Sequence, residues 1–217
     1  MSCYGGLDIG YSDDMTALFL RFVEWKTEEV LDGDGNTKTV QVPHFKQLVW
    51  YWSCEERVKR SERERVNWRP WVEAGHIEIA GKKKLDEDFV AQRILEIIGN
   101  FKLQELGFDK YKSREITKKL LAKKVKCVEI RQSAEVLNDP IRRFKDMVES
   151  GDYTHDGNPV FLYNLQNTRV KTVKDKYETI HKDKRLGKID GVAAMLDADR
   201  CFWDAPPPPP PMILGMV

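Results

Sequence analysis

The stretch Gly5-Gly-Leu-Asp8-Ile-Gly10 places a carboxylate in a short apolar strand bounded by glycines. Two later stretches share this pattern: Glu105-Leu-Gly-Phe-Asp109 at the end of a strand, and Lys188-Ile-Asp190-Gly-Val at the start of a helix. A carboxylate beside a buried element is costly unless positive charge meets it. Three of them from distant parts of one chain therefore predict a shared site for divalent metal.

The composition describes one globular domain. The chain has 217 residues, of which 41% are apolar, enough for one sizeable core. No apolar stretch approaches the roughly 20 residues of a membrane helix, and the N-terminal residues lack the pattern of a signal peptide. The scattered cysteines predict reduced, buried thiols rather than a zinc site. They are Cys3, Cys54, Cys127 and Cys201.

Positive charge is unevenly distributed although the net charge is only +1. Basic residues gather over residues 110–131 and 169–188, beside Asp109 and Asp190 respectively. Such clusters can meet the phosphates of DNA. For any single lysine, solvated helix surface is the simpler interpretation. The candidates for DNA contact are Lys110, Lys112, Arg114, Lys184 and Lys188.

Three antiparallel strands are predicted first. One surrounds Asp8, the next covers residues 16–25, and the third includes residues 47–53. Asp-Gly-Asp-Gly-Asn at residues 32–36 is a strong turn signal between the second and third. Residues 55–65 are highly charged, which predicts an exposed segment.

Helices and strands alternate after that point. A short helix ended by Gly75 is followed by helices over residues 85–101, 113–124 and 187–203, and by strands over 106–109 and 126–130. Another helix starts at Asp139, with Pro140 at an early position, and ends near Gly151. This order predicts an α/β fold with a mixed sheet, three antiparallel strands then parallel strands, and helices on both faces.

The domain is predicted to span residues 1–205. Residues 206–217 begin with six prolines and form a proline-rich tail that we expect to be disordered. Asp197 and Asp199 put charge into the last helix, which predicts that its outer face is exposed.

Two divalent ions can activate a water and stabilise the leaving oxygen in phosphodiester hydrolysis. In such a site Asp8 would bridge both ions, while Asp109 and Asp190 would each hold one. Each aspartate also has a simpler interpretation: a turn residue at Asp8, a helix N-cap at Asp109, and a charge at the positive end of a helix at Asp190. Three such residues together are harder to explain as caps.

The motifs resemble a known family, the nuclease domain in the large terminase subunit of tailed bacteriophages. Gly6-Leu-Asp8-Ile-Gly-Tyr-Ser-Asp-Asp14 resembles its start. Residues 149–160, Asn167 and Lys188-Ile-Asp190-Gly-Val resemble its C-terminal signature, and residues 71–77 and 107–111 fall in the expected order. The resemblance covers nearly the whole chain up to about Trp203.

The resemblance implies a ribonuclease H-like fold with an acidic site for two Mg²⁺ or Mn²⁺ ions. It implies an endonuclease that cuts concatemeric double-stranded viral DNA, with little sequence preference, during genome packaging. The family's three aspartates fall on Asp8, Asp109 and Asp190. An ATPase motor, a small terminase subunit and a portal are the implied partners, in the host cytoplasm and away from membranes. No Gly-x-x-x-x-Gly-Lys-Ser/Thr motif occurs here, so the chain itself should not hydrolyse ATP.

Three further residues have open roles. His155 is a catalytic candidate that would position water or contact phosphate, or else a structural histidine of the 156–158 loop. Lys188 would contact phosphate or steady Asp190, or be an exposed lysine. Asp14 matches an acidic position of the family, with an exposed turn residue slightly preferred.

Other function classes stay open on the sequence. A four-way-junction resolvase shares the fold and the acidic cluster. A docking module for the packaging motor or portal, with weak catalysis, is also compatible. An actin-like or sugar-kinase phosphotransferase opens with a similar Leu-Asp-Ile-Gly motif, but the chain is too short for its second lobe.

Overall fold

A central mixed sheet organises the structure, a computed structural model that describes residues 2–31, 33, 35–110, 114–183 and 187–205. β1 (Ser2–Asp8) pairs antiparallel with β2 (Thr16–Leu31), which pairs antiparallel with β3 (Thr37–Ser53). On its other side β1 pairs parallel with β5 (Lys102–Phe108), followed by β6 (Cys127–Glu129). The short strands β4 (Glu78–Ile79) and β7 (Tyr153–Thr154) pair with β3. The predicted mixed sheet is confirmed.

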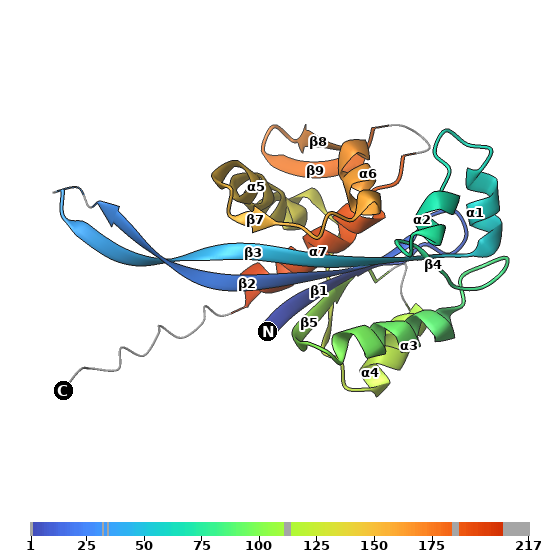
Figure 1. Ribbon diagram of the computed structural model, residues 1–217. Coiled ribbons are helices and arrows are strands. Elements are labelled where there is room, and N and C mark those ends of the chain that lie inside the picture. Colours follow the sequence, from blue (N-terminus) through green and yellow to red (C-terminus); the bar gives the residue numbers. More distant parts are fainter. Residues whose placement is uncertain (1, 32, 34, 111–113, 184–186, 206–217) are drawn as a thin grey trace.

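Helices cover both faces of this sheet, also as predicted (Figure 1). On one face lie α3 (Glu87–Ile98) and α4 (Arg114–Ala122). On the other lie α5 (Ala134–Ser150), α6 (Pro159–Asn167) and α7 (Asp190–Asp204). Each face buries its own apolar cluster, because side chains alternate between the two faces along a strand. α7 lies against β1, β2 and β5, at the middle of the sheet.

Two short helices, α1 (Glu55–Ser61) and α2 (Arg69–Glu73), follow β3. The predicted exposure of residues 55–65 is wrong for one face of α1, where Arg57, Val58 and Ser61 are buried. Arg57 tolerates burial because its guanidinium lies 4.0 Å from the centre of the Trp68 ring and donates to Glu64 at 2.8 Å.

The last helix also differs from its prediction. Asp197 and Asp199 are each 1% exposed, so the face that carries them is not exposed. Asp199 accepts from the buried Arg21 on β2, with Nε at 2.6 Å and the second nitrogen at 2.9 Å. Asp197 accepts from Gln132 Nε2 at 2.7 Å. These hydrogen-bond donors compensate the two carboxylates for the loss of water on burial.

Two β-hairpins lie outside the main body of the central sheet. β2 and β3 stay paired as far as Leu31 and Thr37, on either side of the predicted turn, and form a long arm (Figure 1). A second hairpin, β8 (Thr168–Val173) and β9 (Tyr177–Lys182), was not predicted. It packs beside α5 over the face that carries α7.

Pro140 lies inside α5 rather than near its beginning, so that prediction is wrong. The helix starts after Ser133, with Glu135 in its first turn, where a carboxylate complements the positive end of a helix. The predicted end is confirmed: Gly151 adopts a left-handed conformation and closes the helix.

The cysteines are free, and Cys3, Cys54 and Cys201 are buried while Cys127 is half-buried. Burial raises the pKa of the Cys127 thiol to about 11. Among the described residues, no helix has the length and apolar character needed to cross a bilayer. The predicted tail, residues 206–217, lies outside the described part of the chain.

Candidate metal site at the ends of β1 and β5

Two of the three predicted aspartates stand at the same edge of the sheet. Asp8 is the last residue of β1, and Asp109 directly follows β5. The two strands are parallel, with Leu7 opposite Phe108. Neighbouring parallel strands end at the same edge of the sheet. The residues that follow Leu7 and Phe108, which are Asp8 and Asp109, therefore lie side by side.

Glycines let α7 pack directly on these strands. A methyl group on Gly6 would overlap the carbonyl oxygen of Ala194, and one on Gly107 would lie 2.5 Å from the carbonyl oxygen of Asp197. Only a residue without a side chain permits such an approach. The backbone of α7 therefore touches β1 and β5 at neighbouring positions.

Strand alternation then decides which face the carboxylates share. Residues two apart along a strand project to the same face. Asp8 is two residues beyond Gly6, and Asp109 is two residues beyond Gly107. Both aspartates therefore lie on the face covered by α7.

The direction of α7 brings the third aspartate to this place. At Gly6 the helix contributes Ala198 and Ala194. At Gly107, in the neighbouring strand, it contributes later residues, Asp197 and Cys201. Further along the helix, Phe202 packs against Tyr4, which comes earlier in β1, with ring centroids 5.4 Å apart. α7 therefore runs against the direction of β1 and begins near the strand ends, with Asp190 one turn before Ala194. The backbone positions of the three aspartates converge at one corner.

Polar groups hold the start of α7 in place. Asn164 on α6 accepts from the backbone N–H of Gly191 at 2.6 Å, and the Tyr51 hydroxyl donates to the same oxygen at 3.4 Å. Burial, then the negative charge of Asp190, raises the pKa of Tyr51 well above its ordinary value. Sequence reasoning missed both residues, since neither lies in a charged or glycine-rich motif.

The donors at this corner suit a hard divalent cation. Asp8 is 6% exposed and Asp190 2%, while Asp109 is half-buried. Carboxylate oxygens are the ligands that Mg²⁺ and Mn²⁺ prefer. Within the described residues, no three Asp, Glu, His or Cys side chains already stand in the arrangement that holds a metal ion. The chemistry of the donor set fits the metal.

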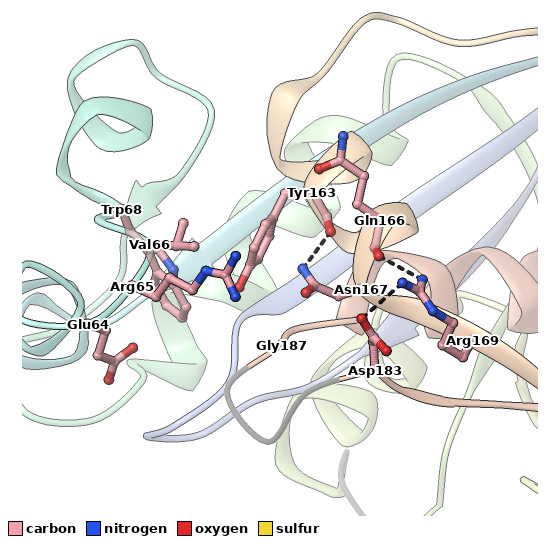
Figure 2. Close-up of a pocket in the computed structure, with 10 residues that line it drawn as sticks. All are labelled: Glu64, Arg65, Val66, Trp68, Tyr163, Gln166, Asn167, Arg169, Asp183 and Gly187. Atoms are coloured by element: carbon pink, nitrogen blue, oxygen red, sulfur yellow. Dashed lines mark hydrogen bonds and ion pairs between the residues drawn. The ribbon is translucent and has the colours of Figure 1, made fainter.

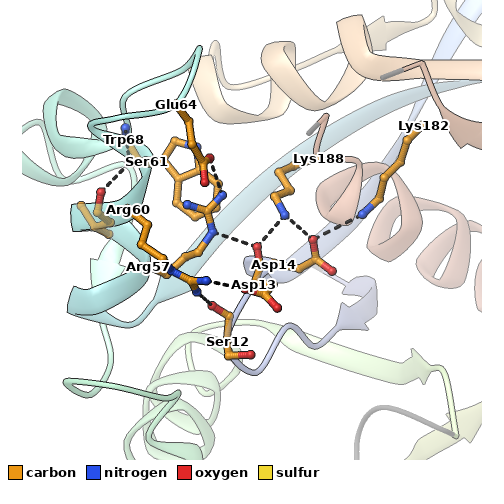
Figure 3. Close-up of polar contacts among 11 residues, drawn as sticks. Ser12, Asp13, Asp14, Arg57, Arg60, Ser61, Glu64, Trp68, Lys182 and Lys188 are labelled. Carbon is orange, nitrogen blue, oxygen red and sulfur yellow. Dashed lines mark hydrogen bonds and ion pairs between the residues drawn. The ribbon is translucent and has the colours of Figure 1, made fainter. Parts of the chain in front are cut away.

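Lys188 and Asp14 lie beside this corner and contact each other (Figure 3). Lys188 is 8% exposed, and its Nζ donates to Asp14 Oδ1 at 2.6 Å. Lys182 approaches the same oxygen at 3.3 Å. Partial burial opposes ionisation of Asp14, but hydrogen bonding and charge from Lys188, then Lys182, lower its pKa. Lys188 is therefore not an exposed lysine, and Asp14 is not a free turn residue.

His155 lies elsewhere. It is exposed, directly follows β7, and accepts from the backbone N–H of Gly157 at 3.0 Å through Nδ1. β3 and β2 separate β7 from β1, which puts about 14 Å between β7 and β1 at about 4.8 Å per strand spacing. The structure does not bring His155 to the three aspartates, and shows it bonded within the 155–158 loop.

The other candidates for DNA contact are less completely described. Lys110 directly follows Asp109, is exposed, and lies 3.1 Å from Glu129. Lys112 and Lys184 lie outside the described residues, and Arg114 begins α4 with a side chain that is not described. Lys110 is thus the predicted DNA contact that the structure places at the exposed rim of the corner.

A cavity of about 600 Å³ opens between the α1–α2 connection and α6 (Figure 2). Arg65 and Tyr163 face each other across it, and Arg169 pairs with Asp183 at its rim at 2.9 Å. Gly187, shortly before α7, is also part of the lining. The cavity therefore lies next to α6 and close to the residues that precede α7.

Together, the mixed sheet, its two helical layers and the carboxylates at the ends of β1 and β5 and the start of α7 define a ribonuclease H-like α/β domain. The chain belongs to the family described as "Terminase large subunit, endonuclease domain", whose model matches residues 48–205. The family resemblance drawn from the sequence is confirmed.

Individual relatives agree with this assignment. The large terminase subunit of Enterobacteria phage HK97 is 25% identical over 195 residues, covering 88% of this chain and 36% of its own length. The crystal structure of the HK97 large terminase matches 92% of this chain and 39% of that chain, with a TM-score of 0.74 and 23% identity.

A more distant match is the large terminase nuclease of thermophilic phage G20c with bound cobalt. It has a TM-score of 0.51 and 14% identity, covering 91% of this chain and 79% of that chain. The described fold thus recurs in a separately solved nuclease domain. By contrast, the chain spans little more than a third of the HK97 protein.

Proposed function

We propose that this domain is a metal-dependent endodeoxyribonuclease that cuts concatemeric double-stranded viral DNA during genome packaging, with little sequence preference. The observation that carries the proposal is the convergence of Asp8, Asp109 and Asp190, imposed by parallel strand ends and by α7 packing on Gly6 and Gly107. Membership of the terminase endonuclease family and the fold shared with a cobalt-bound terminase nuclease support it.

In this proposal Asp8, Asp109 and Asp190 would together hold two Mg²⁺ or Mn²⁺ ions. Such ions, when bound, activate a water and neutralise charge on the leaving oxygen. Asp8 and Asp190 are buried, so their charges favour cations over water as partners.

Other residues of the chain bind and orient the substrate. Lys110, at the exposed rim beside Asp109, is proposed to contact the DNA backbone, together with Lys112, Arg114 and Lys184. Lys188 is left out because its ammonium is buried against Asp14. His155 is left out of the catalytic set because two strands separate β7 from β1.

The whole terminase carries out more than cleavage. We propose that the domain acts in the host cytoplasm with an ATPase motor, a small terminase subunit and a portal. The HK97 large subunit is much longer than this chain, which leaves room for such a motor outside the nuclease domain.

The test is incubation of the purified protein with supercoiled plasmid and with a synthetic four-way junction, in Mn²⁺ or Mg²⁺, with and without EDTA. We expect metal-dependent nicking and linearisation of the plasmid. Cutting restricted to the junction would favour a resolvase instead. Binding of a duplex without any cleavage in either metal would favour a docking module and overturn the proposal.

A further inference from the structure

The loop between β1 and β2, residues 12–14, is held by cations from α1 (Figure 3). Arg57 Nε donates to the carbonyl oxygen of Asp13 at 2.9 Å. Arg60 donates to the carbonyl oxygen of Ser12 at 2.7 Å and pairs with the Asp13 carboxylate at 2.9 Å. Since residues 12–14 come four to six positions after Asp8, α1 restrains the chain shortly beyond a proposed metal ligand.

A third cation reaches the same loop from the opposite side. Lys188 Nζ donates to the carbonyl oxygen of Asp13 at 2.5 Å and to Asp14 Oδ1 at 2.6 Å. The two residues of the ion pair are 174 positions apart in sequence. Lys188 stands two residues before Asp190, and Asp14 six residues after Asp8. Their contact therefore joins the two backbone segments that carry Asp8 and Asp190.

The contact is largely shielded from solvent on its Lys188 side. Lys188 is 8% exposed, so its charge has little access to water and depends on Asp14 for compensation. Arg57, on the other side of the loop, is 3% exposed and rests on the buried Trp68 ring. The loop is thus fixed between a buried arginine and a buried lysine.

We propose that Lys188 and Asp14 are a positioning pair that sets the separation of the Asp8 and Asp190 carboxylates. This inference rests on the proposed metal site. The pair touches neither the metal nor the DNA, and acts by holding the end of β1 against the start of α7. Preorganised carboxylates bind a cation more tightly, because less conformational freedom is lost on binding.

The same contacts argue against Asp14 as a metal ligand. Its carboxylate is already matched by Lys188 and by the more exposed Lys182. A cation on Asp14 would place a further positive charge beside the buried Lys188 ammonium, which is costly.

Calorimetric titration of the whole chain with Mn²⁺, without DNA, tests the proposal. The variants are Lys188→Met, Asp14→Asn and the double variant. Lys145→Met is the matched control, since Lys145 also joins two elements, reaching Glu178 on β9 from α5 at 2.8 Å. Thermal unfolding and hydrogen exchange of residues 8–14 and 189–193 accompany each titration.

We expect each single variant to weaken Mn²⁺ binding about tenfold, as loss of a residue that orients metal ligands does. The double variant should be no weaker than the worse single variant, because both changes remove one contact. Exchange should rise in the two named segments only, and Lys145→Met should bind Mn²⁺ like the wild type.

Contrary outcomes are distinct. If Asp14 is a ligand, Asp14→Asn weakens binding while Lys188→Met leaves it unchanged or strengthens it, and the proposal is wrong. A lower unfolding temperature with unchanged Mn²⁺ affinity would show a merely structural pair and also overturn it. Wild-type protein that neither binds Mn²⁺ nor cuts DNA would overturn the proposed function together with this inference.

Discussion

Arg21 on β2 and Asp199 on α7 form a fully buried ion pair, with both nitrogen–oxygen contacts at 2.9 Å or less. The Arg21 guanidinium also lies 5.0 Å from the centre of the Phe19 ring and 5.3 Å from that of Tyr153. The pair therefore links α7 to β2. It lies nine residues along the helix from Asp190, away from the proposed metal site.

Replacement of Arg21 by Met should lower the free energy of unfolding by about 3–5 kcal/mol, because Asp199 stays buried without its partner. The double variant Arg21→Met, Asp199→Leu should recover most of the loss, since two apolar side chains need no compensation. Urea unfolding measures both. As a control, Lys118→Met removes an exposed pair with Glu115 and should change stability by less than about 1 kcal/mol. Equal losses in Arg21→Met and the double variant would contradict this account.

Gly6→Ala should destabilise the fold by about 3 kcal/mol, the upper end for overpacking, because the new methyl group meets the backbone of α7. It should also weaken Mn²⁺ binding, since α7 carries Asp190. Gly33→Ala is the matched control: an added methyl group there meets nothing within 4 Å. Chemical denaturation and Mn²⁺ titration of both variants provide the measurements. A Gly6→Ala protein as stable as Gly33→Ala would show that the helix does not lie on β1 as described.

Asp8→Asn and Asp190→Asn should each reduce plasmid cleavage in Mn²⁺ by more than about a hundredfold, since even residues outside the ligand set often cost ten- to a hundredfold. Both changes preserve shape, so far-UV circular dichroism should stay unchanged. His155→Ala provides the comparison, because β3 and β2 lie between β7 and β1. It should cut DNA within about threefold of the wild-type rate. Undiminished cleavage in either aspartate variant would remove that residue from the proposed site.

The contribution of Asp14 to stability should depend on pH in a defined direction. Its pKa is lowered in the folded protein below the ordinary value of 3.8, so the folded state favours the carboxylate. The stabilisation is complete well above that value and is lost as pH falls through the lower folded-state pKa. The difference in unfolding free energy between wild type and Asp14→Asn should therefore shrink between pH 6 and pH 3. Urea titrations at both values check this, and a difference that grows in acid would contradict it.

Strand ends and helix starts were predictable because their signals are local. Asp8, Asp109 and Asp190 each follow or begin an apolar run beside a glycine. Gly6 and Gly107 are the positions at which α7 packs on the sheet, and Gly191 lies against Tyr51 and Asn164. The antiparallel pairing of β2 with β3 was equally readable. Such features depend on a few adjacent residues, so the sequence displays them directly.

Long-range partners were not readable in the same way. The charge of Asp199 predicts an exposed helix face. In the structure Asp199 is buried because it pairs with Arg21, which is far away in sequence. The charge of Lys188 likewise predicts a DNA contact. In the structure its ammonium pairs with Asp14, another distant residue. The β8–β9 hairpin was missed because its strands are largely polar and half-exposed, so no apolar alternation marks them. In each case the decisive fact is a contact between distant segments.

The β2–β3 arm changes how the molecule should move through solution. From Glu24 and His44 to Leu31 and Thr37, no third strand among the described residues flanks the ribbon, which extends about 25 Å at about 3.4 Å per residue. A protruding rod of that length adds friction out of proportion to its mass. The 25.3 kDa chain should therefore sediment more slowly than a sphere of equal weight, and shortening the arm should speed its sedimentation while the distant carboxylate corner stays intact.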